Sequence, residues 1–226
     1  KICQEKGWAI PPKYGCSIGS ILKYVSGSTC SSCYADERGN YTYTSVQVAQ
    51  TKRLVGLSHP LWVEAVTLLL SKNFDKRFAS SLEEELDFFF CNKGRMPNKK
   101  EWLFLHKKVE DDVSYFRWHD SGDIIALWHL YKIYKVAKRT PYLKHWLPTR
   151  ETKITTSSKK EEKPFNLTIR HSAHMVNGPL PKRVSNVSGV TTSADYTCYA
   201  PDNYNECGSC RDCWNKDIDI IIYLKH

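Results

Sequence analysis

The chain has 226 residues, of which 41% are hydrophobic and 12% aromatic, so it is long enough and apolar enough to form one globular domain with a substantial core. Its 33 basic and 24 acidic residues give a net charge of +9, which favours polyanionic partners. The sequence contains no secretory signal and no apolar run of membrane-spanning length, so we expect neither export nor a membrane anchor. We predict a single domain over residues 1–226.

The first 43 residues have no clear periodicity, but they contain a group of cysteines. Cys30 and Cys33 form a C-x2-C pair, which is a typical metal half-site, and Cys16 could reach that pair across a hairpin loop. The total of nine cysteines is odd and the cysteines are clustered, which favours metal binding over a disulfide framework.

The next part of the chain has helical periodicity. Apolar spacing predicts a helix over residues 45–57 and a second helix that begins at Ser58. Ser81 followed by Glu84 has the spacing of a capping box, which predicts that a third helix starts there. Basic residues are interleaved with aromatic ones over residues 92–108. Such a segment could bind a nucleic-acid strand by charge and stacking, but we favour an amphipathic helix whose aromatic residues face the core.

The second half of the chain alternates between strand and helix patterns. The predicted helix covers residues 123–138, and the predicted strands cover residues 113–118, 143–147, 166–170, 186–191 and 218–224. This alternation predicts an α/β fold with parallel strand pairing, either a partial (βα) barrel or an open parallel sheet. Cysteine-rich loops from both ends of the chain would close this fold around a metal cluster.

Polar residues follow three of the predicted strands, where the chemistry of such folds gathers. His119 could act as a general base or a metal ligand, with Asp120 or Asp123 orienting it or holding a cation. Arg150 and Arg170 could each bind a carboxylate or phosphate, or else form a structural ion pair. The alternative for the segment around Asp123 is the start of a helix, with an Asp or Ser as its cap.

A run of closely spaced cysteines near the end of the chain carries the strongest signal. The four thiols are Cys198, Cys207, Cys210 and Cys213. Three of them stand three residues apart, a spacing that cysteine-ligated iron–sulfur clusters use. Structural zinc and disulfides remain as alternatives, although zinc is more often bound by two separated C-x2-C pairs.

The positive charge is unevenly distributed. Residues 124–150 and 164–194 contain no acidic residue. The basic residues of the first stretch are Lys132, Lys135, Lys138, Arg139, Lys144 and Arg150. A surface of one sign attracts nucleic acid, and a merely solvated basic face is the alternative.

Six sequence blocks occur together in a characteristic order. They are residues 16–20 (CSIGS), 27–35 (GSTCSSCYA), 116–123 (FRWHDSGD), 146–150 (WLPTR), 166–170 (NLTIR) and 207–214 (CGSCRDCW). In these blocks the chain resembles the gene product 88 family of phages and mobile elements, with residues 75–111 as an insertion. The resemblance implies a cysteine-rich protein of the host cytoplasm, with a host protein as a conceivable partner. The family's recurring cysteines match Cys16, Cys30, Cys33, Cys198, Cys207, Cys210 and Cys213.

These seven thiols allow two arrangements of [4Fe–4S] clusters. Either four of them hold one cluster, or the C-terminal four hold a complete cluster and the N-terminal three hold another that has one open iron. The second arrangement is similar to radical S-adenosylmethionine enzymes, although Cys16 stands far outside their usual C-x3-C-x2-C spacing. We therefore expect an iron–sulfur cluster-binding protein of phage or mobile-element origin, and a radical-SAM-like or redox enzyme is the enzymatic form of this hypothesis. The alternatives are a nucleic-acid-binding module with a structural or redox-sensing cluster and a zinc-stabilised interaction protein.

Overall fold

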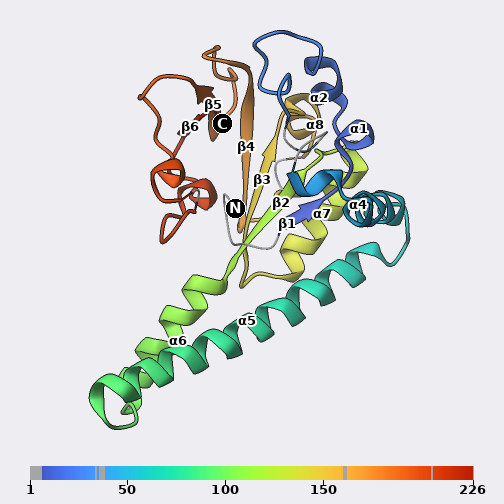
Figure 1. The fold of residues 1–226 in the computed structure, drawn as a ribbon. Helices are drawn as coiled ribbons and strands as arrows, with labels where there is room; N and C mark the ends of the chain where they lie inside the picture. Colours follow the sequence, from blue (N-terminus) through green and yellow to red (C-terminus); the bar gives the residue numbers. More distant parts are fainter. Residues whose placement is uncertain (1–6, 34, 36–38, 160–161, 205, 226) are drawn as a thin grey trace.

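The computed structural model describes residues 7–33, 35, 39–159, 162–204 and 206–225. Its centre is a six-stranded sheet, surrounded by helices of very different lengths (Figure 1). The strands are β1 (Gly7–Ala9), β2 (Tyr115–Ser121), β3 (Lys144–Thr149), β4 (Leu167–Val176), β5 (Val187–Thr191) and β6 (Ile220–Leu224). The helices are α1 (Pro12–Gly15), α2 (Ser17–Leu22), η1 (Gly39–Thr42), α4 (Thr44–Gly56), α5 (Trp62–Lys93), α6 (Lys99–Val113), α7 (Leu127–Arg139), α8 (Thr152–Thr156), η3 (Ala200–Asp202) and η4 (Asp212–Trp214).

The six strands lie in the order in which they occur in the chain, and every neighbouring pair is parallel. This is the strand order of a (βα) barrel, but the sheet is open between β1 and β6 within the described residues. The predicted parallel α/β sheet is confirmed. All carboxyl ends of the strands therefore meet at one edge, and the loops that follow β1, β2 and β3 are neighbours there.

One face of the sheet carries the main hydrophobic core. Phe116 and Trp118 of β2 and Leu147 of β3 pack against α5 and α7, which supply residues such as Trp62 and Leu130. Residues two apart along a strand point to the same face, so the alternate residues turn away from these helices. The apolar spacing of α7 matches this burial, and the predicted helix over residues 123–138 begins four residues later than expected, at Leu127.

The C-terminal segment covers the opposite face. Trp214 of η4 donates a hydrogen bond from Nε1 to the carbonyl of Phe116, and its own carbonyl accepts one from Thr168. Its ring contacts Trp146 of β3, with ring centroids 5.1 Å apart. The last segment of the chain thus returns across the sheet before it forms β6, at the left of Figure 1.

Helix α5 corrects one prediction. The Ser81–Glu84 pattern does not start a helix, because α5 continues unbroken for 32 residues from Trp62 to Lys93. The observed capping box lies at the start of α6, where Asn98 and Glu101 cap one another. Together α5 and α6 form a hairpin that projects from the body (Figure 1). No helix in the described part of the chain is both long and apolar enough to span a membrane.

Candidate metal centre

The loop that carries the first cysteines is fixed to the carboxyl edge of the sheet by three hydrogen bonds. The amide of Asp123, after β2, donates to the carbonyl of Gly15 at 2.7 Å. The amide of Ile18 donates to Oε1 of Glu151, after β3, at 2.9 Å. The amide of Thr29 donates to the carbonyl of His174 on β4, also at 2.9 Å. The chain from residue 15 to residue 29 therefore spans the ends of three strands.

Two of the predicted ligands face one another within this loop. A Cβ atom built on Gly19 of α2 would lie 3.6 Å from the sulfur of Cys16 and 3.6 Å from the sulfur of Cys30. Both thiols thus approach the same backbone position, which is possible because residue 19 has no side chain. The charge of Cys33 also acts on Cys16, so the third thiol belongs to the same group. The structure brings together the three cysteines that we predicted as the N-terminal set.

The environment of Cys16 disfavours a free thiolate. Burial raises the pKa of Cys16 well above its usual value, and the negative charges of Asp123 and Cys33 raise it further. The guanidinium of Arg150 acts in the opposite direction and does not offset these effects. A bound metal deprotonates a coordinating thiol outright, so this group would become anionic only when a metal is present.

Asp123 is a buried carboxylate that holds the strand ends together. It accepts hydrogen bonds from the amide of Ile124, from the hydroxyl of Thr149 at 2.6 Å and from the amide of Arg150 at 2.8 Å. Burial raises the pKa of Asp123 to about 6, although these three hydrogen bonds favour its charged form. The structure therefore places this predicted site residue beside the cysteine loop, as a carboxylate that organises the turns after β2 and β3.

Arg150 reaches the same loop from the end of β3. Its Nε and Nη2 atoms donate to the hydroxyl oxygen of Thr29 at 3.2 and 3.0 Å. Thr29 directly precedes Cys30, so Arg150 holds the backbone next to a predicted ligand and also places positive charge near the thiols.

His119 and Asp120 lie elsewhere. The backbone of His119 has a φ of 52°, and its fully buried ring contacts His129 of α7 on the helix face, with ring centroids 5.3 Å apart. Burial lowers the pKa of His119 well below its usual value, and neither ring nitrogen has a hydrogen-bond partner among the described residues. Asp120 is half exposed, forms an ion pair with Arg117 at 3.3 Å and accepts a hydrogen bond from Tyr41.

Arg170 has a structural environment. Its side chain is fully buried on the face covered by the C-terminal segment. Its Nη atoms donate to five backbone carbonyls, those of Val187, Asp212, Asn215, Ile218 and Asp219. These bonds anchor the turn between η4 and β6, so the contacts of Arg170 are explained without a ligand.

The C-terminal cysteines form a second, separate group. Cys213 is buried, its sulfur lies 3.2 Å from the hydroxyl of Tyr223, and burial raises its pKa to about 12. Cys198 packs in the same cluster, and its charge also raises the pKa of Cys213. Cys207 and Cys210 lie in the intervening loop, where the amide of Cys210 donates to the carbonyl of Cys207. This segment lies at the left of Figure 1, whereas α2 lies at the upper right.

The structure therefore keeps the two predicted cysteine groups apart. Closure of the fold by both loops around one shared cluster is not what the described residues show, because the N-terminal loop lies at the carboxyl edge of the sheet and the C-terminal segment covers one of its faces. Within the described ranges, no three His, Cys, Asp or Glu side chains converge on the position of a single ion. Cys91 is exposed on α5, and Cys3 lies outside the described residues.

The predicted basic surface is used in part for internal contacts. Lys132 donates to the carbonyls of Leu57 and His59, and Arg139 forms an ion pair with Glu64. Lys135 and Lys138 are exposed. The acid-free segment over residues 124–150 is therefore not a continuous face available to nucleic acid, and contact with nucleic acid stays a prediction.

Comparison with known proteins places the chain in a family. A family model described as Gene product 88 matches residues 103–216, just over half of the sequence. The chain belongs to the gene product 88 family. This is a phage-type family, and four of the six sequence blocks that resemble it lie within the match. No curated protein and no solved structure matches the chain.

The match to the gene product 88 family covers strands β2 to β5 and the C-terminal cysteines, while Cys16, Cys30 and Cys33 precede it. Three residues of the N-terminal site were not predicted from the sequence: Gly19, Thr29 and Glu151. Only their neighbours could have indicated them, because Glu151 follows Arg150 at a strand end and the other two lie between Cys16 and Cys30.

Proposed function

We propose that this gene product 88 protein binds an iron–sulfur cluster through Cys16, Cys30 and Cys33 at the carboxyl edge of its sheet. The observation that carries the proposal is the close approach of the thiols of Cys16 and Cys30 to the same residue, Gly19. A glycine at this position lets sulfurs from distant parts of one loop lie near each other.

The arrangement of the thiols favours a cluster over zinc at this site. The ligands of one zinc ion must all lie within about 2.3 Å of it, so they converge tightly. The cysteines of a [4Fe–4S] cluster each bind a different iron and therefore stand farther apart. Cys16 and Cys30 meet at Gly19 and the charge of Cys33 acts on Cys16, and three thiols spaced along one loop suit ligands that each bind a different iron.

Three cysteine ligands would leave one iron of a [4Fe–4S] cluster open, and such a cluster supplies an electron and a binding position for a small molecule, as in radical S-adenosylmethionine enzymes. The strand order supports this reading, because a sheet wound in chain order places the loop after β1 next to the ends of β2 and β3. The chain's own residues hold the loop in position: Glu151 binds the amide of Ile18, Arg150 binds Thr29, and Asp123 ties the two strand ends together.

The C-terminal cysteines would hold a second metal group with a structural role. Four cysteines can saturate a cluster or a zinc ion, and the buried Cys213 packs with the partly buried Cys198 against Trp146 and Trp214. Metal binding there would contribute directly to stability, because the unfolded chain has no preformed site.

The test is anaerobic purification followed by measurement of iron, acid-labile sulfide and zinc per chain. We expect a brown protein with iron and sulfide, and a marked loss of iron when Cys16, Cys30 and Cys33 are changed together to alanine. Cys91→Ala is the matched control, because Cys91 is exposed on α5 and should not alter the metal content. Release of methionine and 5′-deoxyadenosine from S-adenosylmethionine under dithionite would support the enzymatic part of the proposal. A colourless protein that contains zinc alone would overturn the proposal.

A further inference from the structure

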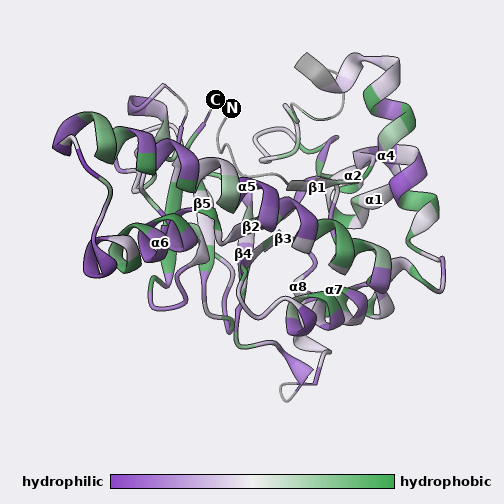
Figure 2. Cartoon of the chain, turned by 90° about the horizontal axis from the view of Figure 1, so that it is seen from below, coloured by the Kyte–Doolittle hydropathy of each residue, from purple (hydrophilic) through white to green (hydrophobic). Residues whose placement is uncertain are grey.

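The α5–α6 hairpin exposes more apolar surface than its two helices can bury between them. Three phenylalanines follow one another on α5, and each residue advances about 100° around a helix, so they cannot all face α6. Phe89 packs beneath Arg95, whereas Phe88 is 69% exposed and Phe90 is 52% exposed. Figure 2 shows hydrophobic and hydrophilic turns alternating along both helices. An apolar surface of this kind on a projecting element indicates an interaction site.

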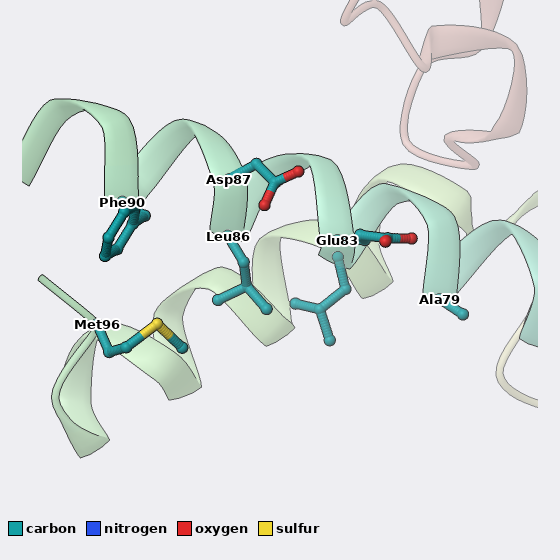
Figure 3. Close-up of a pocket in the computed structure, with 7 residues that line it drawn as sticks. Ala79, Glu83, Leu86, Asp87, Phe90 and Met96 are labelled. Atoms are coloured by element: carbon teal, nitrogen blue, oxygen red, sulfur yellow. The ribbon is translucent and has the colours of Figure 1, made fainter. Parts of the chain in front are cut away.

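Part of this surface is a groove with an apolar floor and acidic residues beside it. The groove has a volume of about 440 Å³ and is lined by Ala79, Leu82, Glu83, Leu86, Asp87, Phe90 and Met96. These residues of α5 recur at spacings of three and four, so they form one helix face, which Met96 extends from the turn (Figure 3). The ion pairs of the hairpin use other acids and, among the described residues, leave Glu83 and Asp87 without a basic partner.

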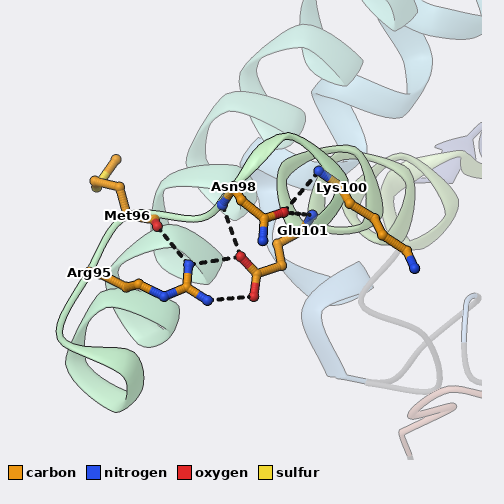
Figure 4. A network of polar contacts seen from close by, with 5 residues as sticks. All are labelled: Arg95, Met96, Asn98, Lys100 and Glu101. Atoms are coloured by element: carbon orange, nitrogen blue, oxygen red, sulfur yellow. Dashed lines mark hydrogen bonds and ion pairs between the residues drawn. The ribbon is translucent and has the colours of Figure 1, made fainter.

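The turn that borders the groove is held in a single shape. Gly94 ends α5 with a φ of 63°, and Arg95 then donates to both carboxylate oxygens of Glu101 and to the carbonyl of Met96. Asn98 caps α6 by accepting hydrogen bonds from the amides of Lys100 and Glu101 (Figure 4). Because these contacts preorganise Met96, docking against it would cost little additional ordering.

The same hairpin carries a surface of complementary character. Lys99, Leu103 and Lys107 of α6 stand four residues apart and so follow one another along one face of the helix. Leu103 is 60% exposed between the two exposed lysines. Lys107 pairs with Glu110 and Asp111 of its own helix, so Lys99 is the cation that the ridge offers to a partner. The α6 ridge, defined as these three residues, is apolar and basic, whereas the α5 groove is apolar and acidic.

We propose that the hairpin binds a second copy of the chain, with the α6 ridge of each copy seated in the α5 groove of the other. A two-fold pair uses the same surface on both subunits, so that surface must carry both complementary halves, and the hairpin carries both. Leu103 would enter the groove beside Leu86 and Phe90, and Lys99 would pair with Asp87. Four helices packed in this way would bury the apolar residues that two helices leave exposed.

Sedimentation velocity of the purified full chain over a wide concentration range tests this proposal. We expect a dimer whose dissociation constant rises at least about tenfold in Phe90→Ser, as for loss of a central apolar anchor. Phe88→Ser is the matched control, because Phe88 is equally apolar and more exposed but lies almost opposite Phe90 around the helix. It should leave the dimer unchanged.

Reversing the charges of Asp87 and Lys99 distinguishes loss of the proposed contact from loss of the fold. Asp87→Lys and Lys99→Glu should each weaken the dimer, and the double variant should restore it, because the pair is rebuilt with its charges reversed. Circular dichroism checks that each variant keeps its helices. A chain that is monomeric at every concentration, or a dimer that is unaffected by Phe90→Ser and by both charge reversals, would overturn the proposal. Such a result would leave the metal site untouched, because the two features lie on different parts of the fold.

Discussion

The indole nitrogen of Trp118 donates a hydrogen bond to Nδ1 of His145, 3.2 Å away and completely buried. The other ring nitrogen of His145 lies 2.9 Å from the hydroxyl of Thr140. The ring is therefore fixed between two strands and a helix end as a neutral imidazole, since Nδ1 must carry a lone pair to accept the bond. Burial lowers the pKa of His145 to about 3 and that of His129 to about 3.

These buried histidines predict a loss of stability in acid. Their pKa values are lower in the folded chain than the value of about 6.5 expected when unfolded, so the unfolded chain binds more protons between pH 6.5 and 3. The stabilisation that these neutral histidines contribute should therefore be complete above pH 6.5. The free energy of unfolding should fall as the pH drops towards 3, by up to about 1.4 kcal/mol per pH unit for each such histidine. Urea denaturation of the full chain at several pH values measures the slope. His145→Gln should reduce that slope, and an unchanged slope would show that His145 does not contribute to it.

Gly19→Ala tests the close approach of the two thiols to residue 19. The new methyl group would lie 2.9 Å from Cβ of Cys16 and 3.6 Å from both sulfurs, so Cys16 and Cys30 would have to move apart. We expect a clear loss of iron per chain in anaerobically purified protein, with the helix content retained.

Gly56→Ala is the control for this substitution. Gly56 also lies in a helix, and a Cβ atom there meets nothing within 4 Å. Alanine should therefore stabilise α4 by about 0.5–1 kcal/mol and leave the iron content unchanged. Equal iron contents in the two variants would contradict the proposal that the thiols beside Gly19 bind the cluster.

The parallel sheet was predictable because each strand is short, apolar and bounded by turn residues. The prediction for residues 218–224 contains the observed β6, and that for residues 186–191 matches β5 to within one residue. The first strand, β1, was missed, since its three residues Gly7–Ala9 are too few for an alternation to be seen. The unbroken α5 was also missed, because Ser81 and Glu84 imitate a capping box inside a helix whose apolar residues are not confined to one stripe.

The candidate site was predictable in its residue types more than in its geometry. Asp123 and Arg150 lie beside the cysteine loop because both follow parallel strands that end at the same edge. His119 was expected there too, but its positive φ turns the ring towards α7. A non-glycine residue rarely adopts this conformation, so no sequence pattern signals it. The five carbonyls around Arg170 come from β5, from η4 and from the segment between η4 and β6, and only the folded chain brings them together.

Arg170→Ala should destabilise the chain strongly. The substitution leaves five backbone carbonyls without their buried donor, and losing one partner of a buried charged network costs about 3–5 kcal/mol. Chemical denaturation followed by tryptophan fluorescence is a suitable measurement, because Trp214 lies in the anchored segment. Arg139→Ala provides the comparison: its ion pair with Glu64 is half exposed, so its loss should lower the stability far less. Similar losses in the two variants would mean that the Arg170 network does not anchor the C-terminal segment.

Asn98→Ala should loosen the end of the hairpin without unfolding the body. The side chain of Asn98 accepts hydrogen bonds from the amides of Lys100 and Glu101, and the loss of such a cap costs about 1 kcal/mol. The effect should be local, because Asn98 lies at the far end of the projecting helices (Figure 1). Hydrogen exchange should therefore rise about fivefold at the amides of the first turn of α6 and stay constant in β2 and β3. Lys100→Ala serves as the control, since it keeps the cap and removes only an exposed side chain. Faster exchange throughout the sheet would show instead that the hairpin and the body unfold as one unit.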